Sequence, residues 1–310
     1  MDDTALLLEY LDKAHVRLLV SVDLAGSTAL KKLAEVDEEM PWIITFEAFY
    51  REYPIQLGEA YSSMLPGYID QEPFKTHQRL TVFKILGDEI LFQVELNRHE
   101  QVLYHIWAIR ESVKNFNVRL EQHYRFLRCK PTAWLAGFPV VNSEVYVTES
   151  GRSLPLDYIG PSMDTGFRLT KLATPRKFIL SFDLALMLTD ALTISGSANS
   201  TLRLFYDGSQ PLAGVLGGVP YPIIWVDELD DASLEERLSG QVRECCNPRE
   251  LGEYCRAFRE SNGLWRWFVK GDAHPDYRGP DHVAYEGPNE EWLNRYRTIK
   301  AKREQYSNNF

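Results

Sequence analysis

RLLVSVDLAGST, at residues 17–28, is the most informative segment of this chain. Its first eight residues are mostly leucine and valine, too apolar for a strand with one face in water, so we expect a central strand. The run extends to Leu24, with Asp23 near its end, and Ser27 or Thr28 can cap a helix that follows Gly26. A carboxylate at the end of a buried strand is costly unless it is paired or metal-bound. Asp23 can therefore be a helix cap, half of a buried salt bridge, or a functional ligand.

On both sides of this strand, hydrophobic periodicity predicts a mixed series of helices and strands. We expect helices over residues 4–14, 42–64 (interrupted near Pro54), 99–127, 162–173 and 183–191. Further strands are expected over residues 78–86, 90–96, 133–140, 144–148, 178–181, 202–206 and 221–226. The strands on either side of Gly87-Asp88-Glu89 read as a hairpin. The order of elements predicts an α+β or α/β sheet domain.

Two segments divide the chain further along. Residues 195–200 are rich in Gly and Ser and read as a linker, and DELDDASLEE at residues 227–236 reads as a boundary. We therefore expect a sheet domain over residues 1–228 and a helical C-terminal extension over residues 229–310. The extension is rich in Trp, Tyr and Arg, and we expect it to pack against the sheet domain or a partner chain. His274 reads as a surface loop residue.

Composition narrows the classes of protein that are possible. The 310 residues are 45% hydrophobic and 25% charged, which is ordinary for a globular protein. The net charge of −10 argues against non-specific binding to nucleic acid. The four cysteines show neither disulfide nor zinc spacing, the first residues lack signal-peptide character, and no long apolar run occurs. We expect a cytoplasmic protein without a membrane span.

Asp88 is the second carboxylate of interest, because it lies at the tip of a hairpin between apolar strands. Alone, it is an ordinary turn residue. Two carboxylates at the ends of neighbouring strands can, however, hold two divalent cations, which stabilise the attacking and leaving oxygens in phosphoryl transfer. Asp23 and Asp88 are therefore candidate metal ligands, and Glu89 can add negative charge or face solvent.

Three segments together resemble the signatures of class III nucleotidyl cyclases. They are SVDLAGSTALKKL at residues 21–33, FKILGDEILFQVEL at 83–96 and LDYIGPSMDTGFRLTKLA at 156–173, in the same order as in the family. LAGVLGGVPYPIIWV, at residues 212–226, resembles the final hairpin of that fold more faintly. The resemblance covers about residues 10–228. It implies an α+β fold with a ferredoxin-like core, flanking helices and, in this chain, a helical C-terminal extension.

The resemblance also implies roles for individual residues. Asp23 and Asp88 match the ligands of two divalent cations, Mn²⁺ or Mg²⁺. Lys84 and Asp157 match the positions that contact the base, and Arg168 matches the arginine that stabilises the transition state. Each of these also has an ordinary interpretation: Arg168 as a solvated helix residue, Lys84 as an outward strand residue and Asp157 as a turn residue.

Two positions depart from the family pattern. Asp164 stands where the family has an asparagine that orients the ribose, one helical turn before Arg168. A carboxylate there can accept from a ribose hydroxyl but cannot donate. The triphosphate-binding lysine of the family should fall near Ala213, where this chain has none. The triphosphate must then be held by another basic residue, or by the metals, Arg168 and the backbone. Otherwise the domain is a degenerate, inactive one.

Residues alone do not settle the base. Lys84 and Asp157 offer one donor and one acceptor, which serve any of the four bases. Tyr50, in the bulky run FEAFYREY, can reach a base and favour a small one, or it can be a core aromatic.

The whole chain is similar to the pyrimidine cyclases of Pycsar anti-phage defence. That similarity implies a nucleoside triphosphate substrate, with UTP favoured over CTP, and 3′,5′-cyclic UMP and pyrophosphate as products. It also implies a separate cyclic-nucleotide effector protein, and a homodimer whose active sites are each shared by two protomers. The alternatives are a cytidylate or adenylate cyclase, or a non-catalytic nucleotide-binding homologue.

Overall fold

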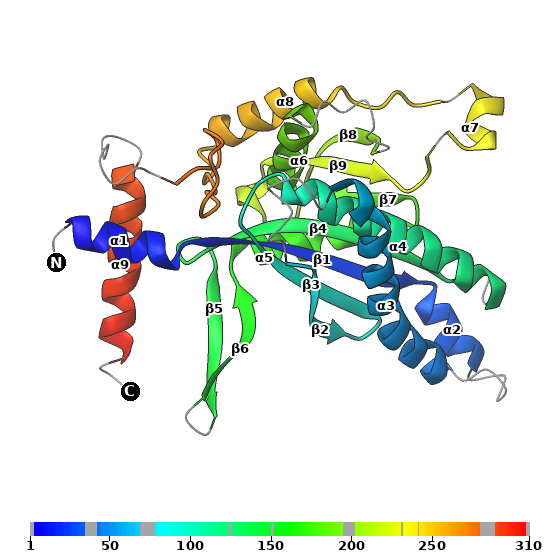
Figure 1. Ribbon diagram of the computed structural model, residues 1–310, viewed down its shortest axis with the longest axis horizontal. Helices are drawn as coiled ribbons and strands as arrows, with labels where there is room; N and C mark the ends of the chain where they lie inside the picture. Colours follow the sequence, from blue (N-terminus) through cyan, green and yellow to red (C-terminus); the bar gives the residue numbers. More distant parts are fainter. Residues whose placement is uncertain are drawn as a thin grey trace.

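The structure is a computed structural model that describes residues 3–34, 42–68, 78–123, 126–149, 152–194, 202–230, 232–240, 242–279 and 289–307. Its main sheet contains the strands β1 (His15–Ala25), β2 (Thr81–Leu86), β3 (Glu89–Leu96), β4 (Arg128–Phe138), β7 (Lys177–Leu180), β8 (Leu204–Pro211) and β9 (Pro220–Asp227). The strands β5 (Ser143–Glu149) and β6 (Arg152–Ile159) pair separately as a two-stranded ribbon. Figure 1 shows this ribbon projecting away from the sheet.

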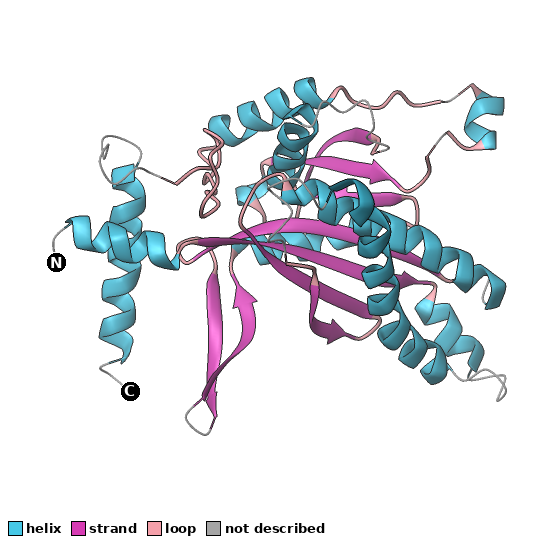
Figure 2. Ribbon diagram, in the orientation of Figure 1, coloured by secondary structure: helices cyan, strands magenta, loops and turns pink. Residues whose placement is uncertain are grey.

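The described helices are α1 (Asp3–Lys13), α2 (Ser27–Ala34), α3 (Trp42–Tyr68), α4 (Gln101–His123), α5 (Pro161–Leu169), α6 (Phe182–Ile194), α7 (Leu234–Ser239), α8 (Pro248–Ser261) and α9 (Asn289–Ser307). In Figure 2 most of them lie against the main sheet, whereas α7 stands apart at the end of a loop and α1 and α9 cross each other at one end of the molecule. No helix in the described ranges combines the length and apolarity needed to cross a membrane.

The first half of the sheet has a ferredoxin-like topology. The elements β1, α3, β2, β3, α4 and β4 follow each other in the chain, and their strands lie in the order β2-β3-β1-β4. All three of these pairings are antiparallel. This is the β-α-β-β-α-β arrangement of ferredoxin-like folds. β7, β9 and β8 extend the sheet beyond β4, so the expected α+β fold is confirmed.

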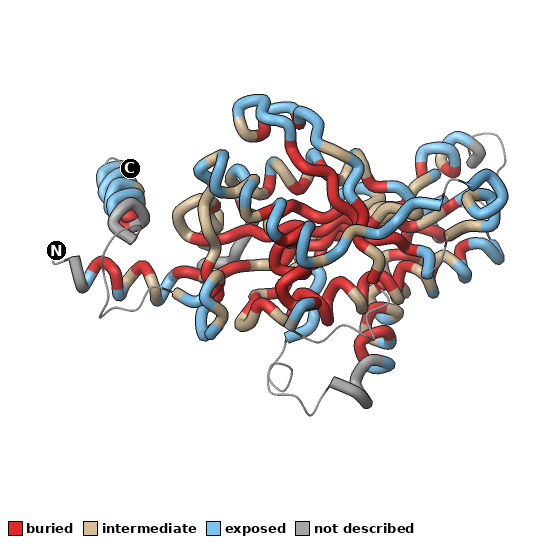
Figure 3. Tube along the Cα trace, turned by 90° about the horizontal axis from the view of Figure 1, so that it is seen from above, coloured by how far each residue is buried: buried red, intermediate tan, exposed pale blue. Residues whose placement is uncertain are grey.

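β1 lies in the middle of this sheet because both of its faces are apolar. Leu18, Val20 and Val22 contribute to the main core under α3 and α4, whereas Leu19 belongs to a second cluster on the opposite face, with Trp134. All five side chains are at most 1% exposed. Figure 3 shows the same result as a buried centre within exposed helices and loops. The expectation of a fully buried central strand is confirmed.

Some expected elements are placed differently by the structure. α3 is continuous through Pro54, although a proline inside a helix removes a hydrogen bond and costs about 3 kcal/mol. Phe49, Tyr53 and Leu57 are each at most 2% exposed, and their burial holds the helix together across the proline. β6 was not expected as a strand, and β4 begins at Arg128 rather than near residue 133. The expected linker at residues 195–200 lies outside the described residues.

The part of the extension that the structure describes packs against the sheet domain, as expected. α8 lies on α6, and the indole of Trp267 covers Gly137 at the end of β4. Asp272 accepts a hydrogen bond from the backbone N–H of His99, at 2.5 Å, and its carboxylate lies 2.9 Å from the His99 Nδ1. The division of the chain at residue 228 stays a prediction.

His274 is not a free surface residue. Its ring lies 4.7 Å from that of His99 and is stacked on Tyr277 at a centroid distance of 5.1 Å. His274 lies in a loop, as expected, but it is half-buried rather than on the open surface, because its ring packs against those of His99 and Tyr277.

Candidate active site

Asp23 and Asp88 come together at one end of the sheet, as the sequence predicted for the ends of neighbouring strands. Asp23 is the residue opposite Glu89 in the pairing of β1 with β3, and Asp88 immediately precedes Glu89 in the turn. The backbone N–H of Leu24 donates to the Asp88 carbonyl at 3.2 Å. The hydroxyl of Ser27, the first residue of α2, donates to the Asp88 carboxylate. The helix start and the hairpin tip are therefore fixed against each other.

Glu89 makes the end of the sheet strongly acidic. Burial raises its pKa above the ordinary value of 4.5, and the negative charges of Asp23 and Asp88 raise it further. Its Oε1 atom is buried and has no hydrogen-bond partner within the described part of the chain. Three carboxylates thus share a small region in which one buried oxygen has no donor. Such an arrangement is stabilised by positive charge.

Lys130 supplies the positive charge that the structure contains at this point. It lies opposite Asp23 in the pairing of β1 with β4, and its Nζ is 2.7 Å from the Asp23 Oδ2. Both side chains are about one quarter exposed, at 23% and 22%. Lys130 is not recognisable as a site residue from the sequence, because the strand is expected there to begin only at residue 133. The register that places Lys130 beside Asp23 follows from the earlier start of β4, at Arg128.

The donor set of this cluster fits divalent cations. Asp23, Asp88 and Glu89 offer only carboxylate oxygens, which are the ligands that Mg²⁺ and Mn²⁺ prefer. The ammonium group of Lys130 lies against Asp23. The carboxylates of Asp23, Asp88 and Glu89 do not all lie within 4.8 Å of one another, so their side chains must turn toward a metal ion to bind it together. We name Asp23, Asp88, Glu89 and Lys130 the carboxylate cluster.

Lys84 and Asp157 form a second group, on the face of the sheet opposite α3 and α4. The Nζ of Lys84, on β2, donates to the Asp157 Oδ1, on β6, at 2.6 Å. Beside them the rings of Phe83 and Tyr158 stack at 4.5 Å. The side chains of Lys84 and Asp157 are 22% and 40% exposed, so a ligand can reach both. The structure places Asp157 on a strand, not in a turn.

Asp164 and Arg168 lie on α5, which begins with a fixed geometry. Gly160 has a φ of 142°, a conformation that favours glycine, and Pro161 follows it as the first helical residue. The Oδ1 of buried Asn142 accepts from the Ser162 N–H at 3.1 Å. Asp164 and Arg168 are both exposed one helical turn apart, so they can meet a ligand that approaches from outside.

Arg168 lies beside the position at which the cyclase resemblance expects a lysine. Its Nε donates to the carbonyl oxygen of Ala213 at 3.0 Å. The loop that follows Ala213 contains Gly214, Gly217 and Gly218, all with positive φ, so its backbone can lie close to a ligand. Arg168 and the expected triphosphate-binding position are thus adjacent, although this chain has no lysine there.

Within one chain, α5 and the carboxylate cluster are separate. α5 contacts the sheet at Gly166, directly against the ring of Trp134, and Trp134 is paired with Leu19 of β1. Asp23 lies four residues further along that strand, or about 13 Å at about 3.3 Å per residue. Across the described ranges, no hydrogen bond or ion pair joins Asp164 or Arg168 to Asp23 or Asp88.

Tyr50 is brought to the hairpin that carries Asp88. It projects from α3, and its hydroxyl donates to the carbonyl oxygen of Gly87. Burial raises its pKa, and the charge of Asp88 raises it further. Tyr50 is half-buried and packs against the main core, so it is both a core aromatic and a neighbour of the candidate metal ligand.

No family model and no curated protein matches this sequence. Similarity is found among solved structures. The adenylyl cyclase CyaB from P. aeruginosa is 15% identical, with a TM-score of 0.44, over 69% of this chain and 94% of that one. The guanylyl cyclase Cya2 is 13% identical, with a TM-score of 0.38, over 69% and 91%. An adenylate/guanylate cyclase/hydrolase from Silicibacter pomeroyi is 15% identical, with a TM-score of 0.42, over 69% and 97%.

Proposed function

We propose that this protein is a nucleotidyl cyclase that converts a nucleoside triphosphate to its 3′,5′-cyclic nucleotide and pyrophosphate. The observation that carries the proposal is the convergence of Asp23, Asp88 and Glu89 at the end of two adjacent strands, with Lys130 in contact with Asp23. This cluster suits a metal-bound triphosphate. The exposed pair of Lys84 and Asp157 offers the separate donor and acceptor that a base requires.

The proposed reaction requires little covalent chemistry from the side chains. Two divalent cations held by Asp23 and Asp88 would lower the pKa of the ribose 3′-hydroxyl and neutralise the leaving pyrophosphate. Arg168 binds phosphoryl oxygens as charge develops on them, because guanidinium is permanently charged and can form two parallel hydrogen bonds. Lys130 contacts the triphosphate in place of the lysine missing at Ala213. Asp164 accepts a hydrogen bond from the ribose.

We further propose that UTP is the preferred substrate and that cyclic UMP is a second messenger in antiviral defence, read by a separate effector protein. The proposal rests on the likeness of the three sequence segments to pyrimidine cyclases. Tyr50, against the turn at Gly87, is placed to limit the room for a base, which favours a pyrimidine. Lys84 and Asp157 then hydrogen-bond to the base that fits, and losing one such bond should change the ratio of kcat/KM between UTP and ATP by about 1–3 kcal/mol.

The site that we propose is shared between two copies of the chain. Asp23 and Asp88 would come from one protomer, and Lys84, Asp157, Asp164 and Arg168 from its partner. Asp23 lies about 13 Å along β1 from the point at which α5 contacts the sheet. This separation supports a shared site, because one chain alone does not bring Arg168 and Asp164 to Asp23. A symmetric dimer would contain two such sites.

The direct test is to incubate the purified protein with each of the four nucleoside triphosphates and Mn²⁺, and to measure pyrophosphate and cyclic nucleotide. We expect cyclic UMP to be the main product. Asp23→Asn and Asp88→Asn should each abolish turnover while circular dichroism stays unchanged, and Glu59→Gln on the exposed side of α3 serves as the control.

Two results would change the proposal. If ATP is cyclised at least about tenfold faster than UTP, the protein is an adenylate cyclase and the pyrimidine assignment fails. If no triphosphate is cyclised but nucleotides bind, the chain is a non-catalytic homologue. The second possibility is favoured by the absence of a lysine at Ala213 and of an asparagine at Asp164.

A further inference from the structure

A cavity of about 120 Å³ lies between α5, the start of α6 and the C-terminal extension. It is lined by none of the residues assigned above to the candidate active site. Pro161 is exposed and Thr165 is half-buried, so the cavity reaches the surface along the first turn of α5. A dry cavity of about 150 Å³ accepts benzene, so this one has room for a slightly smaller molecule.

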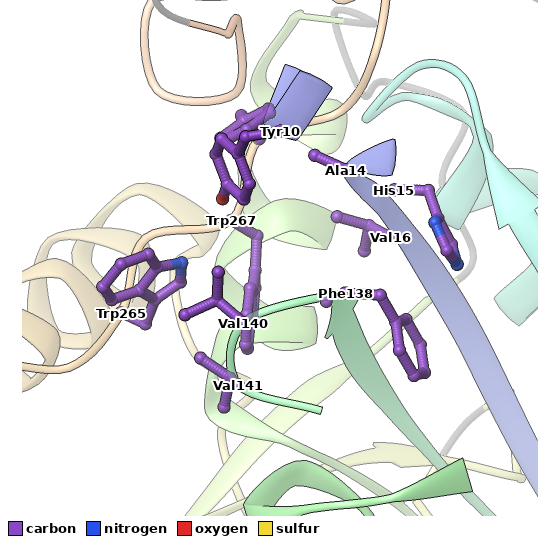
Figure 4. Close-up of a pocket in the computed structure, with 11 residues that line it drawn as sticks. Tyr10, Ala14, His15, Val16, Phe138, Val140, Val141, Trp265 and Trp267 are labelled. Atoms are coloured by element: carbon purple, nitrogen blue, oxygen red, sulfur yellow. The ribbon is translucent and has the colours of Figure 1, made fainter. Parts of the chain in front are cut away.

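The extension forms one wall of this cavity. Trp265 and Trp267 of the extension line it. The same two side chains also line a neighbouring pocket, which Figure 4 shows. That pocket has a volume of about 10 Å³ and holds one water molecule at most. The smaller pocket is therefore not a ligand site. The larger cavity becomes a site only when the extension is packed against α5 and α6.

Aromatic rings dominate the lining of the larger cavity. They belong to Trp134, Phe182, Tyr221, Trp265 and Trp267. Among the described residues that line it, Asp183 is the one charged side chain, and no lysine, arginine or histidine is present. The wall thus combines aromatic rings with one negative charge, which disfavours anions. The guanidinium group of Arg295 already lies over the Trp265 ring, 5.0 Å from its centroid, so this wall holds a cation within the protein itself.

Within the described ranges of the chain, no ion pair joins the carboxylate of Asp183 to a basic side chain. Its Oδ2 accepts from the Trp267 Nε1 at 2.7 Å, and its Oδ1 accepts from the Leu184 N–H at 2.9 Å and from the Ser181 hydroxyl. These donors are neutral. Burial raises the pKa of Asp183, which is the expected result when a carboxylate is desolvated without a basic neighbour.

We propose that this cavity binds a small organic ammonium ion, of the quaternary or alkylated kind, with its charge beside Asp183 and its alkyl groups against the aromatic side chains of the lining. Such cations are weakly hydrated and attracted to aromatic rings. Mg²⁺ and Ca²⁺ favour sites with several carboxylate or carbonyl oxygens, whereas Asp183 is the one carboxylate among the described residues of the lining. A neutral apolar molecule would fill the volume but leave the carboxylate unbalanced.

Calorimetric titration of the full-length protein with tetramethylammonium chloride tests this inference. tert-Butanol is the matched neutral probe, because it has the same branched shape, and sodium chloride controls for ionic strength. We expect tetramethylammonium to bind at least about tenfold more tightly than tert-butanol, since a desolvated cation–π contact is worth about that factor. Equal binding of the two probes, or no binding of the cation, would overturn the proposal.

Two variants locate the site. Asp183→Asn keeps the shape of the cavity but removes its charge, so it should weaken tetramethylammonium binding about tenfold and leave tert-butanol unchanged. Asp12→Asn, at a side chain that is 81% exposed, is the control and should change neither. If Asp183→Asn does not fold, Trp265→Leu tests the same site from the extension. Unchanged cation binding in a folded variant of either kind would refute the assignment.

Discussion

The ammonium group of Lys130 lies 2.7 Å from the carboxylate of Asp23, which belongs to a cluster of three acidic side chains. Lys130→Met should therefore lower the melting temperature of the protein in EDTA, because Asp23 loses its counter-ion. The free energy of unfolding should fall by about 1 kcal/mol, as expected when a partly exposed ion pair is lost. Mn²⁺ should then raise the melting temperature of the variant more than that of the wild type, because a bound cation replaces the missing charge.

Differential scanning fluorimetry with and without Mn²⁺ measures this difference. Lys32→Met, at an exposed lysine of α2, is the matched control and should respond to Mn²⁺ as the wild type does. Equal Mn²⁺ shifts in all three proteins would show that Lys130 does not share a site with the metal.

Glu89 gives the cluster a pH dependence. Its pKa is raised in the folded protein above the ordinary 4.5, so the folded state holds the proton more tightly than the unfolded state. The stability that protonated Glu89 contributes is fully present below pH 4.5 and is lost as the pH rises through the raised pKa. At neutral pH, Glu89→Gln should therefore stabilise the protein in EDTA.

Urea denaturation at several pH values checks the sign of this effect. The variant should be more stable than the wild type at neutral pH, and the difference should vanish below about pH 4.5. A variant that is less stable at neutral pH would mean that ionised Glu89 has a partner that compensates its burial.

The candidate site could be predicted from sequence where its residues lie at the ends of recognisable elements. Asp23 and Asp88 were found because each terminates or joins apolar strands, and the structure places them together. Lys130 could not be found in this way. Its position depends on the register between β1 and β4, and that register is set by packing between segments about a hundred residues apart.

At the scale of elements, α5 is held in place by a glycine contact. A Cβ atom built on Gly166 would lie 2.2 Å from the ring of Trp134, so Gly166→Ala must push the helix away from the sheet. We expect a loss of about 1–3 kcal/mol in the free energy of unfolding, as for other overpacked sites. Because α5 also carries Asp164 and Arg168, cyclase activity should fall more than the loss of folded protein explains.

Gly58→Ala is the matched control for this prediction. Gly58 also lies within a helix, α3, but a Cβ atom there would meet nothing within 4 Å. This substitution should stabilise the protein by about 0.5–1 kcal/mol, because alanine favours a helix over glycine. Chemical denaturation compares the two variants, and similar effects of both would show that the contact with Trp134 does not position α5.

The elements that could be predicted are those whose pattern is local. The buried run of β1 and the hairpin of β2 and β3 were expected, and both are confirmed. The continuity of α3 through Pro54 was not, because it depends on aromatic side chains that pack against other elements. β6 was missed for a related reason. It pairs with β5 outside the main sheet, so it lacks the apolar pattern of a buried strand.

At the scale of the whole molecule, the extension and the sheet domain meet through contacts that no local pattern reveals. Asp272 of the extension binds His99, in the turn just before α4, and Tyr277 donates to Asp190 of α6 at 2.6 Å. Arg256 of α8 also pairs with Asp190. These groups are far apart in the sequence, so their pairing follows from the packed structure, and it ties residues of the extension to two helices of the sheet domain.

A shared active site makes one prediction that belongs to the assembly alone. Asp23→Asn and Arg168→Ala should each be inactive as pure proteins, because each removes one half of every site. Mixed under conditions in which subunits exchange, they should form heterodimers in which one site has both mutations and the other has none. Activity should then return to about half that of the wild type per heterodimer. The control mixture is Asp23→Asn with Asp88→Asn, which lie in the same half and should not complement. If fluorescence energy transfer demonstrates exchange and no activity returns to the first mixture, the two groups do not form a site between chains.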